Sequence, residues 1–134
     1  DLAPPQLGSH PYEFVLPHDG LPLALISPAN NKMISSTLGE FNYPTLRVTI
    51  HPADAATRHI GDGEPVVVWN ELGRVECEAM ISDRIRQGVV AIPKGAWRNS
   101  SLNGSTATAL CPDHVNDVGG GACFNDARVD VAPL

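Results

Sequence analysis

The residues with the clearest chemical potential form one short motif, His51-Pro-Ala-Asp54. A carboxylate accepts two N–H donors from the edge of a planar base such as guanine, and an imidazole nitrogen can contact the same ligand. Pro52 fits the first position of a short helix, whose free N-terminus would also suit an anion. A structural interpretation stays open: Asp54 could pair with Arg58 four residues later, and His51 could cap the turn.

A second set of polar residues lies in the stretch from Pro93 to Asp126, where apolar periodicity is almost absent. A stretch of this length inside a compact domain is usually functional or disordered. Its ligand-handling residue types include Trp97 and Asn116. We expect Trp97 to line a site, whereas Trp69, at the end of an apolar run, is expected in the core.

The three cysteines do not make a recognisable metal or nucleophile site. Cys111-Pro-Asp-His114 with Cys123 supplies one short ligand pair, and structural zinc needs two. Nothing favours either of these cysteines as a nucleophile, and Cys77 is expected in the core because it falls on the apolar side of an alternating stretch. Without paired carboxylates or a triad, the sequence indicates a ligand-holding domain rather than a self-sufficient enzyme.

The elements that must position these residues are short strands. Alternating or uniformly apolar runs predict six of them, at residues 21–27, 46–50, 66–70, 74–81, 89–92 and 127–131. One short helix is expected over residues 52–60, and Gly73 is expected to take positive φ in a hairpin loop. Short strands with glycine corners favour a mainly β fold, and we expect a closed barrel with one or two short helices and a long late loop. Two similar turns, Ile60–Gly63 and Ile85–Gly88, suit a barrel with pseudo-twofold symmetry.

Size and charge narrow the functional class. The 134 residues predict one domain at 20–134, preceded by a proline-rich extended lead-in or linker at 1–19. A net charge of −6, from 15 acidic and 9 basic residues without a basic cluster, argues against nucleic acid. No apolar run is long enough to span a membrane and no signal peptide is visible. An odd number of cysteines favours a reducing compartment, so a cytoplasmic location is expected.

Several segments, taken in order, resemble a known family. They are Ser27-Pro-x-Asn30, Ser35-Ser-Thr37, Ile50-His-Pro-Ala-Asp-Ala55, Ile60-Gly-Asp-Gly-Glu-Pro-Val66, Asn70-x-x-Gly73, Ile85-x-x-Gly-Val89, Pro93-Lys-Gly-x-Trp97 and Phe124-x-Asp-x-Arg-Val129. Together they resemble the C-terminal molybdopterin-dinucleotide-binding domain of the DMSO reductase and formate dehydrogenase class of oxidoreductases. The resemblance covers roughly residues 20–134.

The resemblance implies a six-stranded double-psi β-barrel and a bis(molybdopterin guanine dinucleotide) cofactor carrying molybdenum or tungsten. It implies cofactor contacts from the turn after the first strand, a guanine contact from the His-Pro-x-Asp motif and a late loop that closes over the pterin. In this sequence the implied contacts are Ser27, Asn30 and Ser36, then His51 and Asp54, then Lys94, Gly95, Trp97 and Asn116.

One segment departs from the family pattern. Many relatives read Asn-x-Leu-Thr where this chain reads Thr108-Ala-Leu-Cys111, so a pterin contact from that asparagine cannot be carried over. The family's metal ligand and any iron–sulfur cysteines lie in other domains. We therefore expect the remainder of a larger oxidoreductase as partner and no catalysis by this fragment alone. The alternative is a free-standing double-psi barrel that binds a protein or peptide.

Overall fold

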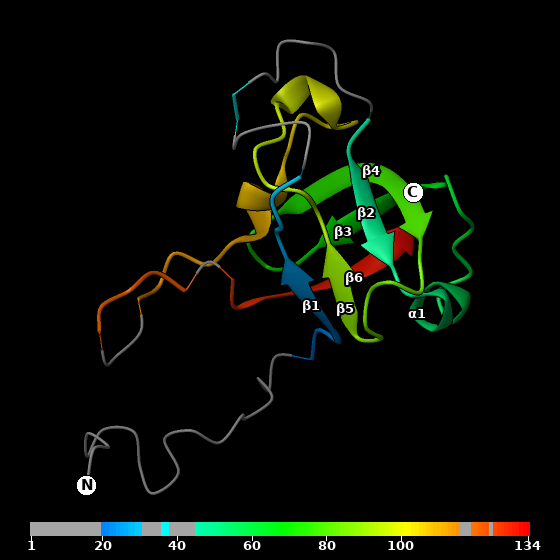
Figure 1. Cartoon of the computed structure of the whole chain (residues 1–134), viewed down its shortest axis with the longest axis horizontal. Coiled ribbons are helices and arrows are strands. Elements are labelled where there is room, and N and C mark those ends of the chain that lie inside the picture. Colours follow the sequence, from blue (N-terminus) through cyan, green and yellow to red (C-terminus); the bar gives the residue numbers. More distant parts are fainter. Residues whose placement is uncertain (1–19, 31–35, 38–44, 116–118, 124) are drawn as a thin grey trace, which may run out of the picture.

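The computed structural model describes residues 20–30, 36–37, 45–115, 119–123 and 125–134, so the lead-in expected at residues 1–19 lies outside the described residues. Six strands close into a barrel in the order β1-β5-β2-β4-β3-β6 (Figure 1). They are β1 (Leu23–Ile26), β2 (Arg47–Ile50), β3 (Pro65–Trp69), β4 (Arg74–Ile81), β5 (Val89–Ala91) and β6 (Ala127–Pro133). The helical segments are α1 (Pro52–Ala56) and the 3-10 turns η2 (Arg98–Ser100) and η3 (Ala107–Leu110). The predicted mainly β closed barrel is confirmed.

The barrel consists of two interlocked halves. Strands β1 and β5 pair in parallel, as do β2 and β4, and the other four pairs are antiparallel. Exchanging β1 with β4, β2 with β5 and β3 with β6 leaves every pairing unchanged, which is the pseudo-twofold symmetry of a double-psi barrel. The two similar glycine turns are not symmetry mates, however, because one precedes β3 and the other precedes β5.

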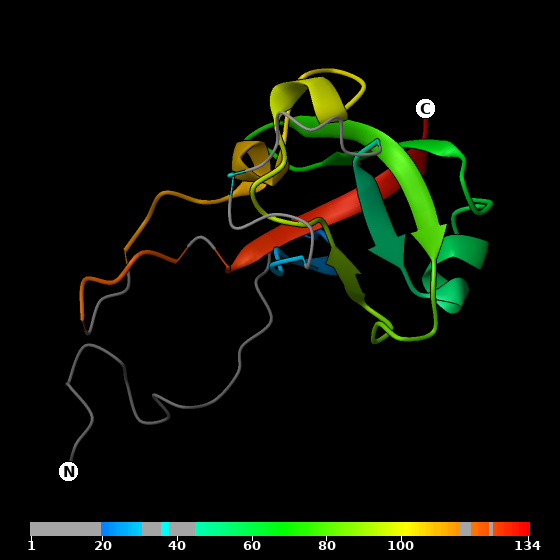
Figure 2. The ribbon, with the colours of Figure 1, turned by 45° about the horizontal axis from the view of Figure 1, so that its top comes forward.

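Strand direction sends different loops to the two ends of the barrel. Because β5 runs parallel to β1 and antiparallel to β2, the carboxyl ends of β1 and β5 emerge together and that of β2 emerges at the opposite end. Figures 1 and 2 both place α1, which follows β2, far from the turn η3. The barrel therefore has an α1 end and an η3 end.

The core is built from the inward side of each strand. Val66 and Val68 are fully buried, but Trp69 is 41% exposed, so its predicted place in the core was wrong. Strand β3 alternates like the others, and its outer side is not covered by described residues at Trp69. Cys77 is fully buried, as predicted.

The helix after β2 is shorter than predicted. It ends at Ala56, and the chain turns through His59, whose φ is +56°. Part of its first turn is engaged by the chain itself, because His51 Nδ1 accepts the Ala53 N–H at 3.1 Å and Pro52 has no N–H. An anion position at this helix start stays a prediction, with the His51 side chain already bonded to one of its N–H groups.

Gly73 is required for a close approach and not for positive φ, so that prediction was wrong. A Cβ on Gly73 would lie 2.8 Å from the Ala109 carbonyl oxygen of η3. The neighbouring Asn70 amide nitrogen donates to the carbonyls of Leu110, at 2.9 Å, and Arg128, at 3.2 Å. The β3–β4 hairpin thereby fastens η3 to the barrel and makes a further contact with β6.

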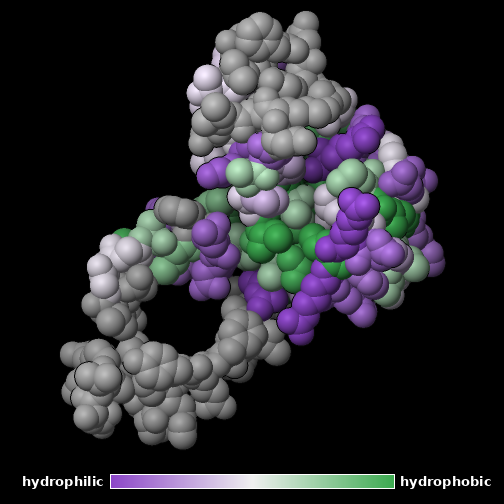
Figure 3. All heavy atoms as spheres, viewed as in Figure 1, coloured by the Kyte–Doolittle hydropathy of each residue, from purple (hydrophilic) through white to green (hydrophobic). Residues whose placement is uncertain are grey.

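The outer surface is mixed in character. Figure 3 shows hydrophobic residues over β1 and β5 in the middle of one face, with hydrophilic residues around them. Ile26, the last residue of β1, is 43% exposed. Among the described residues, none of the helices has the length and apolar composition needed to cross a membrane.

Replacing Gly73 by alanine should destabilise the fold by about 1–3 kcal/mol, because its Cβ would overlap a backbone oxygen that cannot move without displacing η3. Gly61→Ala is the matched control, since its Cβ would meet the flexible Glu64 side chain and should cost less than about 1 kcal/mol. Urea denaturation measures both. Equal losses in the two variants would contradict the close-approach explanation.

Burial raises the pKa of the Cys77 thiol from 9.0 to about 12, so the folded state keeps the proton that the unfolded chain loses. The resulting stabilisation is complete below pH 9 and is lost as the pH rises towards 12, at about 1.4 kcal/mol per pH unit. Cys77→Ala should remove this contribution and flatten the alkaline fall in unfolding free energy relative to the parent chain. Parallel pH dependences for the two proteins would show that Cys77 does not titrate in this way.

Candidate functional site

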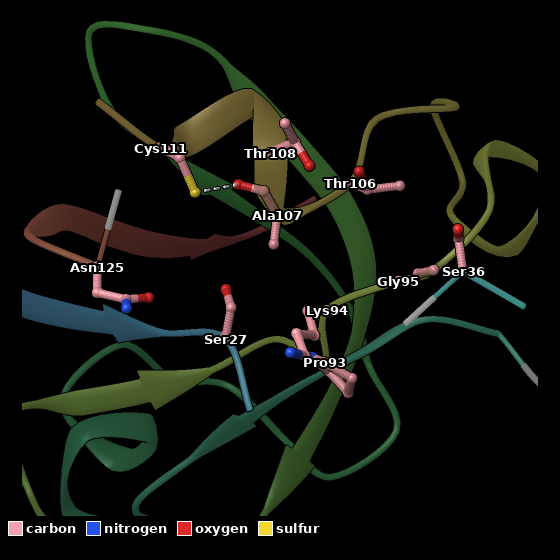
Figure 4. Close-up of a pocket in the computed structure, with 11 residues that line it drawn as sticks. Ser27, Ser36, Pro93, Lys94, Gly95, Thr106, Ala107, Thr108, Cys111 and Asn125 are labelled. Carbon is pink, nitrogen blue, oxygen red and sulfur yellow. Dashed lines mark hydrogen bonds between the residues drawn. The ribbon is translucent and has the colours of Figure 1, made fainter. Parts of the chain in front are cut away.

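A cavity of about 520 Å³ opens at the η3 end of the barrel, within the usual size range for small-molecule sites. Four separate segments surround it: the turn after β1, the loop after β5, the region of η3 and Asn125, two residues before β6 (Figure 4). A fifth contribution comes from Ser36. The lining residues are Ser27, Ser36, Pro93, Lys94, Gly95, Ala96, Thr106, Ala107, Thr108, Cys111 and Asn125.

The parallel pairing of β1 and β5 holds two of these segments side by side. Beyond the strands, the Ile92 N–H donates to the Ile26 carbonyl at 3.1 Å. The Lys94 N–H then donates to the Pro28 carbonyl at 3.0 Å. Gly95 follows with a φ of +81°, which turns the loop over the cavity. Ser27 and Lys94 are thus fixed next to each other by backbone hydrogen bonds.

The cavity offers donors suited to an anion. Its polar side chains are the hydroxyls of Ser27, Ser36, Thr106 and Thr108, the Asn125 amide and the Lys94 ammonium group. Ammonium, hydroxyl and amide groups all donate hydrogen bonds to phosphate oxygens. No carboxylate is among the described lining residues, so this cavity lacks the acceptor that the guanine N–H edge prefers.

Cys111 lies in the cavity wall as a neutral thiol. Its Sγ–H donates to the Ala107 carbonyl at 3.2 Å, and burial raises the pKa of the thiol above its usual value. Because the thiolate is the reactive form, this environment disfavours nucleophilic chemistry by Cys111. Among the residues that the structure describes, no three His, Cys, Asp or Glu side chains group closely enough to hold a metal ion.

The structure brings together part of the predicted late-loop site. Ser27, Ser36, Lys94 and Gly95 all line the cavity. Trp97 does not line it, but its indole N–H donates to the Ser36 carbonyl at 2.6 Å and so anchors a lining residue. Asn30 is not among the lining residues, and Asn116 lies outside the described part of the chain.

His51 and Asp54 belong to the opposite, α1 end of the barrel. Asp54 is buried, and its Oδ2 accepts the Gly88 N–H at 2.7 Å, while His51 caps α1. The alternative, a pairing of the Asp54 carboxylate with Arg58, is not seen: the Arg58 guanidinium donates instead to Asp130 Oδ1, at 2.8 Å, and to the Asp54 backbone carbonyl. A guanine contact from His51 and Asp54 stays a prediction, and the barrel separates it from the cavity.

The cavity also contains residues that the motifs did not identify. Thr106 and Asn125 come from irregular segments without periodicity, and Asn125 lies within the Phe124-x-Asp126 segment. Thr108 could have been found, since it occupies the position where the resembled family has asparagine. The structure places it at the cavity, with a hydroxyl in place of an amide.

Comparisons with known proteins agree with this architecture. The model of the family described as "Molydopterin dinucleotide binding domain" matches residues 30–128. The probable oxidoreductase YoaE of Bacillus subtilis is 36% identical over 87 residues, covering 65% of this chain and 13% of that protein. The trimethylamine-N-oxide reductase of Haemophilus influenzae is 34% identical over 100 residues, covering 67% of this chain and 12% of that protein.

A solved structure shows the same fold. Acetylene hydratase from Pelobacter acetylenicus superposes with a TM-score of 0.73 over 85% of this chain, at 16% sequence identity, and the match covers 18% of that enzyme. The chain thus spans about an eighth of the length of the two relatives above and less than a fifth of this structure. With three quarters of its residues matched by the family model, the chain belongs to the molydopterin dinucleotide binding domain family.

Proposed function

We propose that the cavity at the η3 end holds the phosphate-bearing part of a molybdopterin guanine dinucleotide. The observation that carries the proposal is the donor set, which combines one ammonium group, four hydroxyls and one amide without a carboxylate. Such donors, placed around a cavity, can bond several oxygens of one phosphate group. Family membership indicates that the ligand is a molybdopterin dinucleotide. The donors of the cavity indicate that this end of the barrel contacts its phosphates.

The division of work between protein and cofactor follows from the residues present. The pterin and its metal supply the redox chemistry when the cofactor is bound. This chain contributes binding and orientation: Lys94 neutralises charge, Ser27 and Thr108 donate hydrogen bonds, and Gly95 turns the loop over the ligand. The described residues offer no proton-transfer pair or metal ligand set at the cavity.

The finer form of the proposal is a bis(molybdopterin guanine dinucleotide) carrying molybdenum or tungsten, shared with the rest of a larger oxidoreductase in the cytoplasm. The relatives support a larger enzyme because each is about eight times longer than the matched segment. The metal ligand and any iron–sulfur cluster would then belong to that remainder. A free-standing barrel that binds a peptide has no comparable support, because the relatives named above are an oxidoreductase and a reductase.

Replacing Lys94 by glutamine should weaken binding of guanosine diphosphate to the 134-residue chain by about tenfold, equivalent to ~1.4 kcal/mol. The loss follows because a charge-assisted hydrogen bond to phosphate disappears. The affinity is measured by titrating guanosine diphosphate and monitoring the amide chemical shifts, at low and at high salt. Pyrophosphate serves as the competitor.

Arg84→Gln is the matched control, since it removes one positive charge from an exposed turn just after β4, at the α1 end. It should leave the affinity within about twofold. Equal weakening by both substitutions would indicate a general charge effect, and unchanged affinity in the Lys94 variant would contradict the proposal.

A further inference from the structure

We propose that Asp54 is a positioning residue for the cavity and acts on it through β5 from the other end of the barrel. The inference rests on the proposed function only where ligand binding is the readout. Asp54 is the one charged residue that is buried in the described part of the chain, at 8% exposure. A buried carboxylate requires hydrogen-bond partners, and its Oδ2 finds one in the Gly88 N–H at 2.7 Å.

Gly88 lies directly before β5, at the point where β5 is aligned with β1. Its φ of +80° is a conformation that glycine adopts readily. Its carbonyl accepts the Ala24 N–H of β1 at 2.9 Å, directly before Ala24 pairs with Val89. The Asp54 carboxylate therefore holds Gly88 through its N–H and the β1 backbone holds it through its carbonyl, and together they set the starting position of β5.

The other end of β5 leads into the cavity wall. Strand β5 has only three residues, so about 10 Å of extended backbone joins the Gly88 turn to the loop that carries Lys94. β1 runs alongside in parallel and leads to Ser27. A change in the start of β5 is thus transmitted along a short paired strand to Pro93–Ala96, which line the cavity.

The backbone that carries the Asp54 carboxylate is itself held in place by hydrogen bonds. The Asp54 carbonyl accepts hydrogen bonds from Thr57 Oγ1 at 2.9 Å and from the Arg58 guanidinium at 3.0 Å. Arg58 also donates to Asp130 of β6 at 2.8 Å. The segment 51–58 is therefore tied to β6, and it can hold the Gly88 turn in one place.

The experiment compares Asp54→Ala with Asp54→Asn in the 134-residue chain, since asparagine keeps an acceptor oxygen. Hydrogen exchange at Gly88, amide chemical shifts of residues 94–96 and the affinity for guanosine diphosphate are measured for each. Asp54→Ala should speed Gly88 exchange at least tenfold, shift the amides of residues 94–96 and weaken the nucleotide about tenfold. Asp54→Asn should restore most of each change.

Asp62→Ala is the matched control, because Asp62 Oδ1 accepts the Ile81 N–H at 2.8 Å, at the carboxyl end of β4. It removes the same kind of bond at the same end of the barrel without touching β5. It should speed exchange at Ile81 and leave both the 94–96 amides and the nucleotide affinity unchanged.

Each alternative result overturns the proposal or separates it from the proposed function. Faster Gly88 exchange with unchanged 94–96 amides would make Asp54 purely structural. Lost nucleotide binding in both variants, with Gly88 protection unchanged, would show that the carboxylate contacts guanine itself. Shifted 94–96 amides in a chain that binds no nucleotide in its parent form would support the positioning role and refute the proposed function. If Asp54→Ala does not fold, the part of each change that Asp54→Asn fails to restore decides. Gly88 exchange and the 94–96 amides must then still move together, and movement of one without the other overturns the proposal.

Discussion

The parallel pairing of β1 with β5 is the constraint on which the rest of the structure depends. Two parallel strands cannot be joined by a tight turn, so the chain must leave the barrel and return between them. Both strands then end at the same side, and each continues into a loop rather than a hairpin. That is why the Ser27 turn and the Lys94 loop lie next to each other although 67 positions of numbering separate them.

The same pairing separates the two barrel ends, and their polar side chains are used differently. At the η3 end, the backbone of both loops is partly satisfied by mutual hydrogen bonds, and the side chains are left to face a cavity. At the α1 end, the polar side chains of His51, Asp54 and Arg58 are consumed by bonds within the protein. A ligand site needs unengaged donors, whereas a fixed scaffold needs engaged ones, and here each requirement is met at a separate end.

Much of the fold was predictable because it depends on local patterns. The alternation over residues 74–81 predicted a strand with Cys77 inside, and the structure has both. The exposure of Trp69 and the close approach of η3 to Gly73 could not be predicted in this way. Both depend on which distant segments pack against these residues. The spacing of residues along the chain predicts strands, but it does not say which residues lie at the same end of a barrel.

The candidate site shows the same limit. The resemblance identified Ser27, Ser36, Lys94 and Gly95, all of which line the cavity, because motif order carries three-dimensional information that periodicity lacks. It assigned His51 and Asp54 a separate guanine contact, which stays a prediction, but motif order did not reveal that strand direction sends those two to the opposite end of the barrel. Thr106 and Asn125 come from irregular segments, where no repeating pattern marks the inward side.

Paramagnetic relaxation by Mn²⁺-bound guanosine diphosphate tests the central claim most directly, with the Mg²⁺ complex as the diamagnetic reference. The metal ion marks where the phosphates bind, so the amides nearest to it broaden most. The account predicts the strongest broadening at residues 94–96 and 106–108, with little effect at Ala53, Asp54 and Gly88. Strongest broadening at Ala53, Asp54 and Gly88 would place the phosphates at the α1 end and contradict it.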